Sequence, residues 1–190
     1  MQLLLSLILW WCGALIPNGK VDILLVGDSI SHVWTWSSEL NNNRHINLTR
    51  VTKNGATTDW GLENLKREYK KPYPPHILII YLGVNDVWGG RYTHTGIQNI
   101  QKMVELSNQH CGYPIIVTGI KTTDAAYTRY QTELQKLKFL SPVWITKPIP
   151  NRGYLRSDGV HLTPAGNVQI GLTVKSSIGW VLIGNPILKY

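Results

Sequence analysis

The stretch ILLVGDSISHVW, residues 23–34, is an apolar run that ends in Gly27, Asp28 and Ser29 and then continues with amphipathic spacing. Such a run is typical of a strand buried on both faces, followed by a turn into a helix. Two interpretations of Ser29 are open at this point. Either it caps the helix, as serine often does, or the turn presents its hydroxyl as a nucleophile.

The pattern of this stretch recurs along the chain. Short apolar runs predict strands at 21–26, 46–51, 77–82, 115–120 and 143–147. Helical spacing follows them at 30–39, 58–70, 95–110, 124–139 and 163–175. Because strands alternate with helices, we predict an α/β fold with a doubly wound parallel sheet in a single domain, residues 18–190.

Glycine and polar residues follow the predicted strands. Gly55 comes after the second strand in TKNGATT, and Asn85 comes after the third in LGVNDVW. Asp158 and His161 lie in RSDGVHLTPAG, just before the last predicted helix. Sites in open parallel sheets form outside the carboxyl ends of the strands, so these residues are expected to gather with Ser29.

These four blocks, GDS, the glycine loop, GVND and DGVH, resemble in kind and order the signatures of the SGNH, or GDSL-type, hydrolase family. Each block alone arises often by chance, but together they span roughly residues 21–175. The resemblance implies a three-layer α/β/α sandwich with a five-stranded parallel sheet, the flavodoxin-like fold of that family.

The resemblance also implies site residues. Ser29 would be the nucleophile, His161 the general base and Asp158 the group that orients the imidazole. The oxyanion hole would consist of the backbone N–H groups of Ser29 and Gly55 and the side-chain amide of Asn85.

The activity that follows from the resemblance is ester hydrolysis through an acyl-enzyme. The chain has no long insertion that could cover a large lipid, which favours a small acyl group such as acetyl, on a carbohydrate or another soluble ester. Two other functions remain open: an O-acyltransferase with the same triad, and a non-catalytic protein on this fold that binds glycans or the cell envelope.

Several aromatic residues closely follow the site blocks. Trp34, Trp60 and Trp88 lie behind the first three blocks, and flat apolar rings suit sugars and acyl groups alike. We predict Trp88, Arg91 and Trp34 as substrate-binding residues. The competing interpretation is that Trp34 and Trp60 pack helices onto the sheet.

Three polar residues near the blocks have other interpretations. His32 lies three residues after Ser29 and is a rival to His161 as the base. Asp28 and Asp86 are expected to be local residues of a turn and of a helix start.

The net charge of +8 favours anionic surroundings, but the basic residues are scattered except for a cluster at Lys66, Arg67, Lys70 and Lys71. We interpret that cluster as a solvated face and find no recognisable nucleic-acid-binding module. The sequence contains no GxSxG, no HExxH, no Cys–His ligand set and no glycine-rich phosphate loop. It therefore implies neither a metal nor a nucleotide cofactor.

The N-terminal segment, residues 1–17, is mostly apolar up to Pro17 and has the length of a signal-peptide core. We predict a signal peptide or an N-terminal anchor, and hence a secreted, periplasmic or envelope-associated protein. Of the two cysteines, Cys12 lies in this segment, so removal of the segment would leave Cys111 as a small buried thiol without a disulfide partner.

Overall fold

A computed structural model describes residues 20–32, 36–37, 40, 43–90, 93–140 and 142–184 of the 190-residue chain. Its centre is a five-stranded sheet with the order β2-β1-β3-β4-β5, in which every pairing is parallel. The strands are β1 (Val21–Gly27), β2 (Ile46–Thr52), β3 (Ile77–Tyr81), β4 (Tyr113–Ile116) and β5 (Trp144–Ile145).

The first three strands hold the sheet together. β1 pairs with β2 from Val21↔Ile46 to Gly27↔Thr52, and it pairs with β3 on its other edge. All five residues of β3 are buried, as expected for a strand covered on both faces. The ends of β1, β2 and β3 are therefore fixed at one edge of the sheet, where the loops that follow them lie together.

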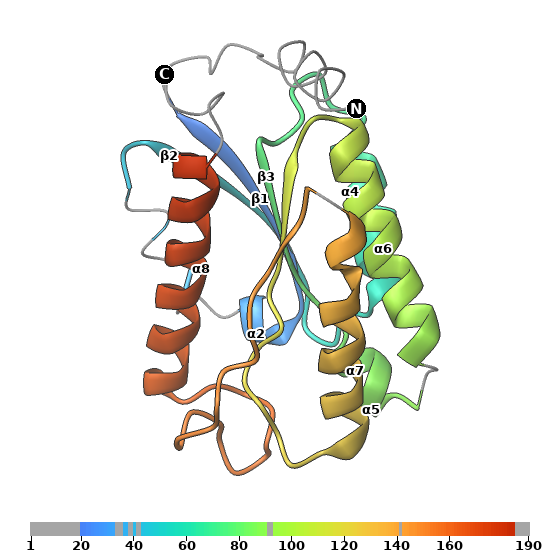
Figure 1. The fold of residues 1–190 in the computed structure, drawn as a ribbon, viewed down its shortest axis with the longest axis vertical. Coiled ribbons are helices and arrows are strands. Elements are labelled where there is room, and N and C mark those ends of the chain that lie inside the picture. Colours follow the sequence, from blue (N-terminus) through green and yellow to red (C-terminus); the bar gives the residue numbers. More distant parts are fainter. Residues whose placement is uncertain are drawn as a thin grey trace.

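Helices cover both faces of the sheet, with α4, α6 and α7 on one side and α8 on the other (Figure 1). The described helices are α2 (Ser29–His32), α4 (Thr58–Glu68), α5 (Val84–Trp88), α6 (Thr93–Gln109), α7 (Ala125–Lys136), the 3-10 helix η2 (Leu137–Leu140) and α8 (Pro164–Gly184). The predicted fold class, a three-layer α/β/α sandwich around a parallel sheet, is thereby confirmed.

Two helices differ from their predicted extents, and a third was not predicted. The continuous helix over 30–39 is wrong, because α2 comprises Ser29–His32 and residues 36–37 form a bend. α8 continues to Gly184, beyond the predicted end at 175. The five-residue α5 begins after Gly83, whose φ is +114°.

Cys111 also differs from its prediction. It lies exposed in the turn between α6 and β4, and it is disulfide-bonded. The expectation of a buried thiol is therefore wrong. The expectation that Cys111 lacks a partner concerns a chain from which residues 1–17 have been removed, and it stays a prediction. Cys12, the other cysteine of the sequence, lies outside the described residues, as does all of the predicted leader at 1–17.

No helix within the described part of the chain has both the length and the apolar character needed to cross a membrane.

Candidate active site

The GDS turn presents Ser29 while a neighbouring residue caps the helix. A Cβ on Gly27 would lie 2.5 Å from the Cβ of Ser31, so only glycine fits at the end of β1. The Oδ1 atom of Asp28 accepts a hydrogen bond from the N–H of Ile30 at 2.9 Å. Asp28 thus does the capping that serine could have done, and the Ser29 hydroxyl is left for another partner.

That partner is His161, which lies 132 residues further along the chain. The Oγ atom of Ser29 is 3.2 Å from Nε2 of His161, and Nδ1 of His161 is 2.8 Å from Oδ2 of Asp158. An isolated bridge between Leu155 and Leu162 folds the segment before α8 back on itself. This fold places His161 beside the carboxyl end of β1, so the structure brings the three predicted residues into one hydrogen-bonded series.

Asp158 is held by its own turn rather than by burial. Its Oδ1 atom accepts hydrogen bonds from the backbone N–H groups of Val160 and His161, both at 2.9 Å. The bond from the Val160 N–H is the largest of the effects that lower the pKa of Asp158 to about 2. The contact with the His161 ring and the bond from the His161 N–H lower it further. The side chain is 47 % exposed, yet it is ionised at any pH near neutrality and aimed at Nδ1 of His161.

One hydrogen bond joins the loop of Gly55 to the helix of Asn85, the predicted oxyanion-hole residues of the second and third blocks. Gly55 lies in the turn between β2 and α4 with a φ of +70°, a conformation that favours glycine. Asn85 lies in the first turn of α5, and its Nδ2 atom donates to the carbonyl oxygen of Ala56 at 3.0 Å. An amide nitrogen carries two N–H groups, so one remains for a ligand.

Asp86 has a larger role than the helix-start residue that we expected. It is 1 % exposed, and its two carboxylate oxygens accept hydrogen bonds from the backbone N–H of Thr58 at 2.9 Å and from the Thr58 hydroxyl at 2.7 Å. The contact spans 28 residues and is not local. The sequence feature that could have indicated this role is the position of Asp86 directly after Asn85.

Asp28 is a buried carboxyl directly before the nucleophile. It is 1 % exposed, and its Oδ2 atom has no hydrogen-bond partner among the described residues. Burial raises the pKa of Asp28 to about 7, against a smaller opposing effect of the bond from Ile30. Nearby Asp86 adds to the rise and nearby His161 opposes it. Asp28 therefore changes charge near neutral pH.

We expect this carboxyl to make the protein less stable as the pH rises. The pKa of Asp28 is about 7 in the folded state, against an ordinary value of 3.8 for an aspartate side chain. Folded Asp28 therefore holds its proton between those values while the unfolded chain loses it, and the free energy of unfolding falls by up to about 4 kcal/mol. Asp28→Asn cannot ionise and should lack this loss. Urea unfolding of both proteins at pH 4 and pH 8 measures it, and parallel pH dependences would contradict the assignment.

The rival base, His32, has a different hydrogen-bond partner. Its Nδ1 atom lies 3.1 Å from the hydroxyl of Thr52 at the end of β2. The hydrogen bond of the Ser29 hydroxyl is with His161. The structure therefore favours His161 of the two candidates.

The predicted substrate-binding residues are only partly described. Trp88 ends α5 and is 44 % exposed, so its ring is available beside the third block. Trp34 and Arg91 lie outside the described residues. Trp36 is a core residue, 2 % exposed, whose indole N–H donates to the carbonyl of Ile30 at 3.2 Å. Trp60 is half-buried and packs against the core, as the competing interpretation had it.

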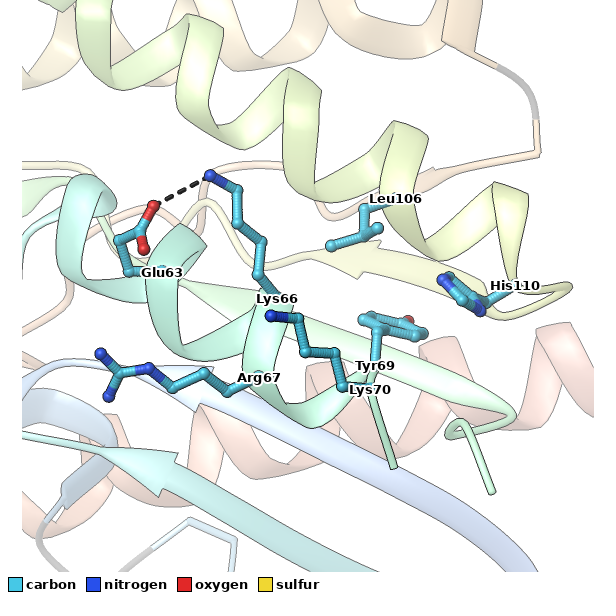
Figure 2. Close-up of a pocket in the computed structure, with 7 residues that line it drawn as sticks. All are labelled: Glu63, Lys66, Arg67, Tyr69, Lys70, Leu106 and His110. Atoms are coloured by element: carbon cyan, nitrogen blue, oxygen red, sulfur yellow. Dashed lines mark hydrogen bonds and ion pairs between the residues drawn. The ribbon is translucent and has the colours of Figure 1, made fainter. Parts of the chain in front are cut away.

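A separate groove of about 440 Å³ lies between the C-terminal parts of α4 and α6 and contains none of the predicted site residues (Figure 2). Lys66, Arg67 and Lys70 surround it, and Lys66 forms an ion pair of 2.9 Å with Glu63. Cations near the end of a helix complement its dipole. Within the described ranges, no three His, Cys, Asp or Glu side chains are grouped so that they could hold a metal ion.

The known proteins to which this chain is similar include esterases and lipolytic hydrolases. No family model matches the chain. An arylesterase from Vibrio mimicus is 24 % identical over an alignment of 184 positions, and the alignment covers 85 % of this chain and 90 % of that protein.

Solved structures resemble the whole domain. They include the esterase EstA from Pseudoalteromonas sp., with a TM-score of 0.70 and 17 % identity over 86 % of this chain and 99 % of that one. A G-D-S-L lipolytic protein from Veillonella parvula has a TM-score of 0.73 and 14 % identity over 84 % of this chain and 99 % of that one. A family 3 carbohydrate esterase from Talaromyces cellulolyticus has a TM-score of 0.70 and 20 % identity over 87 % of this chain and 99 % of that one. The chain has the fold of the SGNH, or GDSL-type, hydrolases.

Proposed function

We propose that the chain is a serine ester hydrolase. The observation that carries this proposal is the hydrogen-bonded series from the Ser29 hydroxyl through the His161 ring to the Asp158 carboxylate. A serine hydroxyl is a weak nucleophile unless a base accepts its proton, and an oriented imidazole is the usual base. The arylesterase and esterases among the similar proteins support the same reaction class.

The reaction would begin with attack of Ser29 Oγ on the carbonyl carbon of the ester while Nε2 of His161 takes the hydroxyl proton. Asp158 keeps a proton on Nδ1 and stabilises the imidazolium that forms. The negative charge on the carbonyl oxygen would be met by the N–H groups of Ser29 and Gly55 and by the free N–H of Asn85.

Collapse of this intermediate breaks the bond to the alcohol oxygen. His161 returns its proton to the departing alcohol, and an acyl group remains on Ser29. Water then attacks the acyl-enzyme with His161 again as base, which releases the carboxylic acid and restores the serine. Each step uses only groups of this chain and water.

We propose a small acyl group, such as acetyl, on a carbohydrate as the substrate. The side chains of His161 and Asp158 are 44 % and 47 % exposed, so the catalytic groups are open to an alcohol portion as bulky as a glycan. The exposed ring of Trp88 is suited to stacking against a sugar. The carbohydrate esterase among the similar structures supports this choice over a long-chain lipid.

The chain-length preference tests this substrate class. With p-nitrophenyl esters from acetyl to dodecanoyl, we expect kcat/KM to be highest for acetyl and to fall at least tenfold by octanoyl, because a site open to water gains little from a long chain. Release of acetate from an acetylated xylan should follow. A maximum at long chains would contradict the proposal, and acetyl transfer to an added glycan in place of hydrolysis would favour the acyltransferase alternative.

The location outside the cytoplasm, with possible association with the envelope, is likewise our proposal. It rests on the apolar segment at residues 1–17.

A further inference from the structure

Asp86 joins α5 to the start of α4 through a buried contact. Its carboxylate accepts hydrogen bonds from both the backbone N–H and the hydroxyl of Thr58, the first residue of α4. The N–H groups at the start of a helix have no partner within the helix, and its dipole favours an anion there. Asp86 is 1 % exposed and Thr58 is fully buried, so water cannot replace this contact.

The residue before Asp86 holds the same loop at a second point. Asn85 donates to the carbonyl of Ala56, which directly follows Gly55 and lies two residues before Thr58. α5 therefore binds the loop after β2 at Ala56 and again at Thr58. The two held points lie one and three residues beyond Gly55, so the loop has little freedom to move relative to α5.

A third helix completes the connection. The Thr58 hydroxyl donates to Asp86 and accepts from Nδ2 of Asn99, in α6, at 3.1 Å. Asn99 is 4 % exposed and also donates to Asp59 at 2.7 Å. Because both hydrogen-bonding roles of the Thr58 hydroxyl are used, its orientation is fixed, and it holds Asp86 in turn.

We infer that Asp86 is a positioning residue of the oxyanion hole: through Thr58 it holds the loop of the Gly55 N–H against the helix that carries the Asn85 amide. The inference rests on the proposed esterase function. Donors to a developing oxyanion act by being fixed before the reaction, and a displacement of about 1 Å can cost roughly a hundredfold in rate. Asp86 itself is buried beneath the site and needs no contact with the substrate.

Thr58→Val tests this role with a small change. Valine keeps the shape and the backbone N–H but removes the hydroxyl bond to Asp86, whereas truncating Asp86 itself would risk unfolding. We expect kcat to fall about tenfold with KM nearly unchanged, because the lost interaction acts on the transition state. Thr58→Ser should restore the rate. Thr132→Val, the same change at an exposed position of α7, should have no effect.

A double-mutant cycle separates positioning from general structural support. In an Asn85→Ala background, the amide that Asp86 helps to place is gone, so Thr58→Val should lower kcat less than about threefold. An equal tenfold loss in both backgrounds would overturn the inference, and so would an unchanged kcat in Thr58→Val alone.

A measurement without substrate keeps the inference distinct from the proposed reaction. In ¹⁵N–¹H spectra of the folded protein, Thr58→Val should shift the side-chain amide signals of Asn85 and the backbone amide of Gly55, while Thr132→Val should leave them in place. Unchanged signals would overturn the positioning role. If Thr58→Val shifts these signals but the wild-type protein hydrolyses no ester, the positioning role is upheld and the esterase function is contradicted instead.

Discussion

Replacing Ser29 with alanine is expected to lower kcat for p-nitrophenyl acetate by roughly a millionfold, to the level of residual catalysis by the remaining site. Alanine removes the hydroxyl oxygen that lies 3.2 Å from His161 Nε2. The fold should be unaffected, because Asp28 rather than Ser29 caps α2. Initial rates at saturating ester, compared with the melting temperature, measure both expectations.

The matched control for this variant is Ser176→Ala, the same change at an exposed position of α8 outside the four blocks. It should retain wild-type activity. A Ser29→Ala protein that keeps more than about one hundredth of the wild-type rate would mean that Ser29 is not the nucleophile, since loss of a nucleophile cannot be so mild.

Replacing Asp158 with asparagine is expected to lower kcat by about a thousandfold to ten-thousandfold. The Oδ1 atom of asparagine can still accept from the N–H groups of Val160 and His161, so the turn should persist. Its Nδ2 group would donate to Nδ1 of His161, which places the ring proton on Nε2. In that tautomer, the histidine cannot take the proton of Ser29.

The pH profile of the wild-type protein checks that Asp158 stays ionised throughout the working range. Because the pKa of Asp158 is about 2, wild-type activity should show no inflection from this carboxylate between pH 5 and 9. A loss below about tenfold in Asp158→Asn would show that the turn alone orients His161. A melting temperature well below the wild type would show instead that the substitution disturbs the turn.

The sheet could be predicted because its sequence signal is continuous. The runs at 21–26 and 77–82 are nearly all Val, Ile and Leu, and a buried parallel strand requires that composition. The short helices could not be predicted equally well. α5 has five residues and α2 has four, so neither is long enough to show a 3.6-residue period. Trp36, predicted on a helix, lies in a bend and packs on Tyr81 at 6.2 Å between ring centroids.

The site was predictable in its members but not in its supporting contacts. Ser29, His161 and Asp158 came from the order of the blocks, which a family resemblance can supply. Which residue caps α2 could not be predicted, because aspartate and serine are both good N-caps and they stand side by side. The bond from Asp86 to Thr58 depends on how two loops meet across the sheet edge, and no local pattern encodes that.

In the proposed reaction, Ser29 becomes covalently bonded to the acyl group. Incubation with an alkyl fluorophosphonate tests it: Ser29 Oγ displaces fluoride from phosphorus, and the intact-protein mass and a peptide map locate the adduct. We predict one adduct per chain, on the peptide that contains Ser29, with none in Ser29→Ala and full labelling in Ser176→Ala. Ester hydrolysis by a wild-type protein that takes no adduct on Ser29, or takes it on another residue, would mean that Ser29 is not the nucleophile.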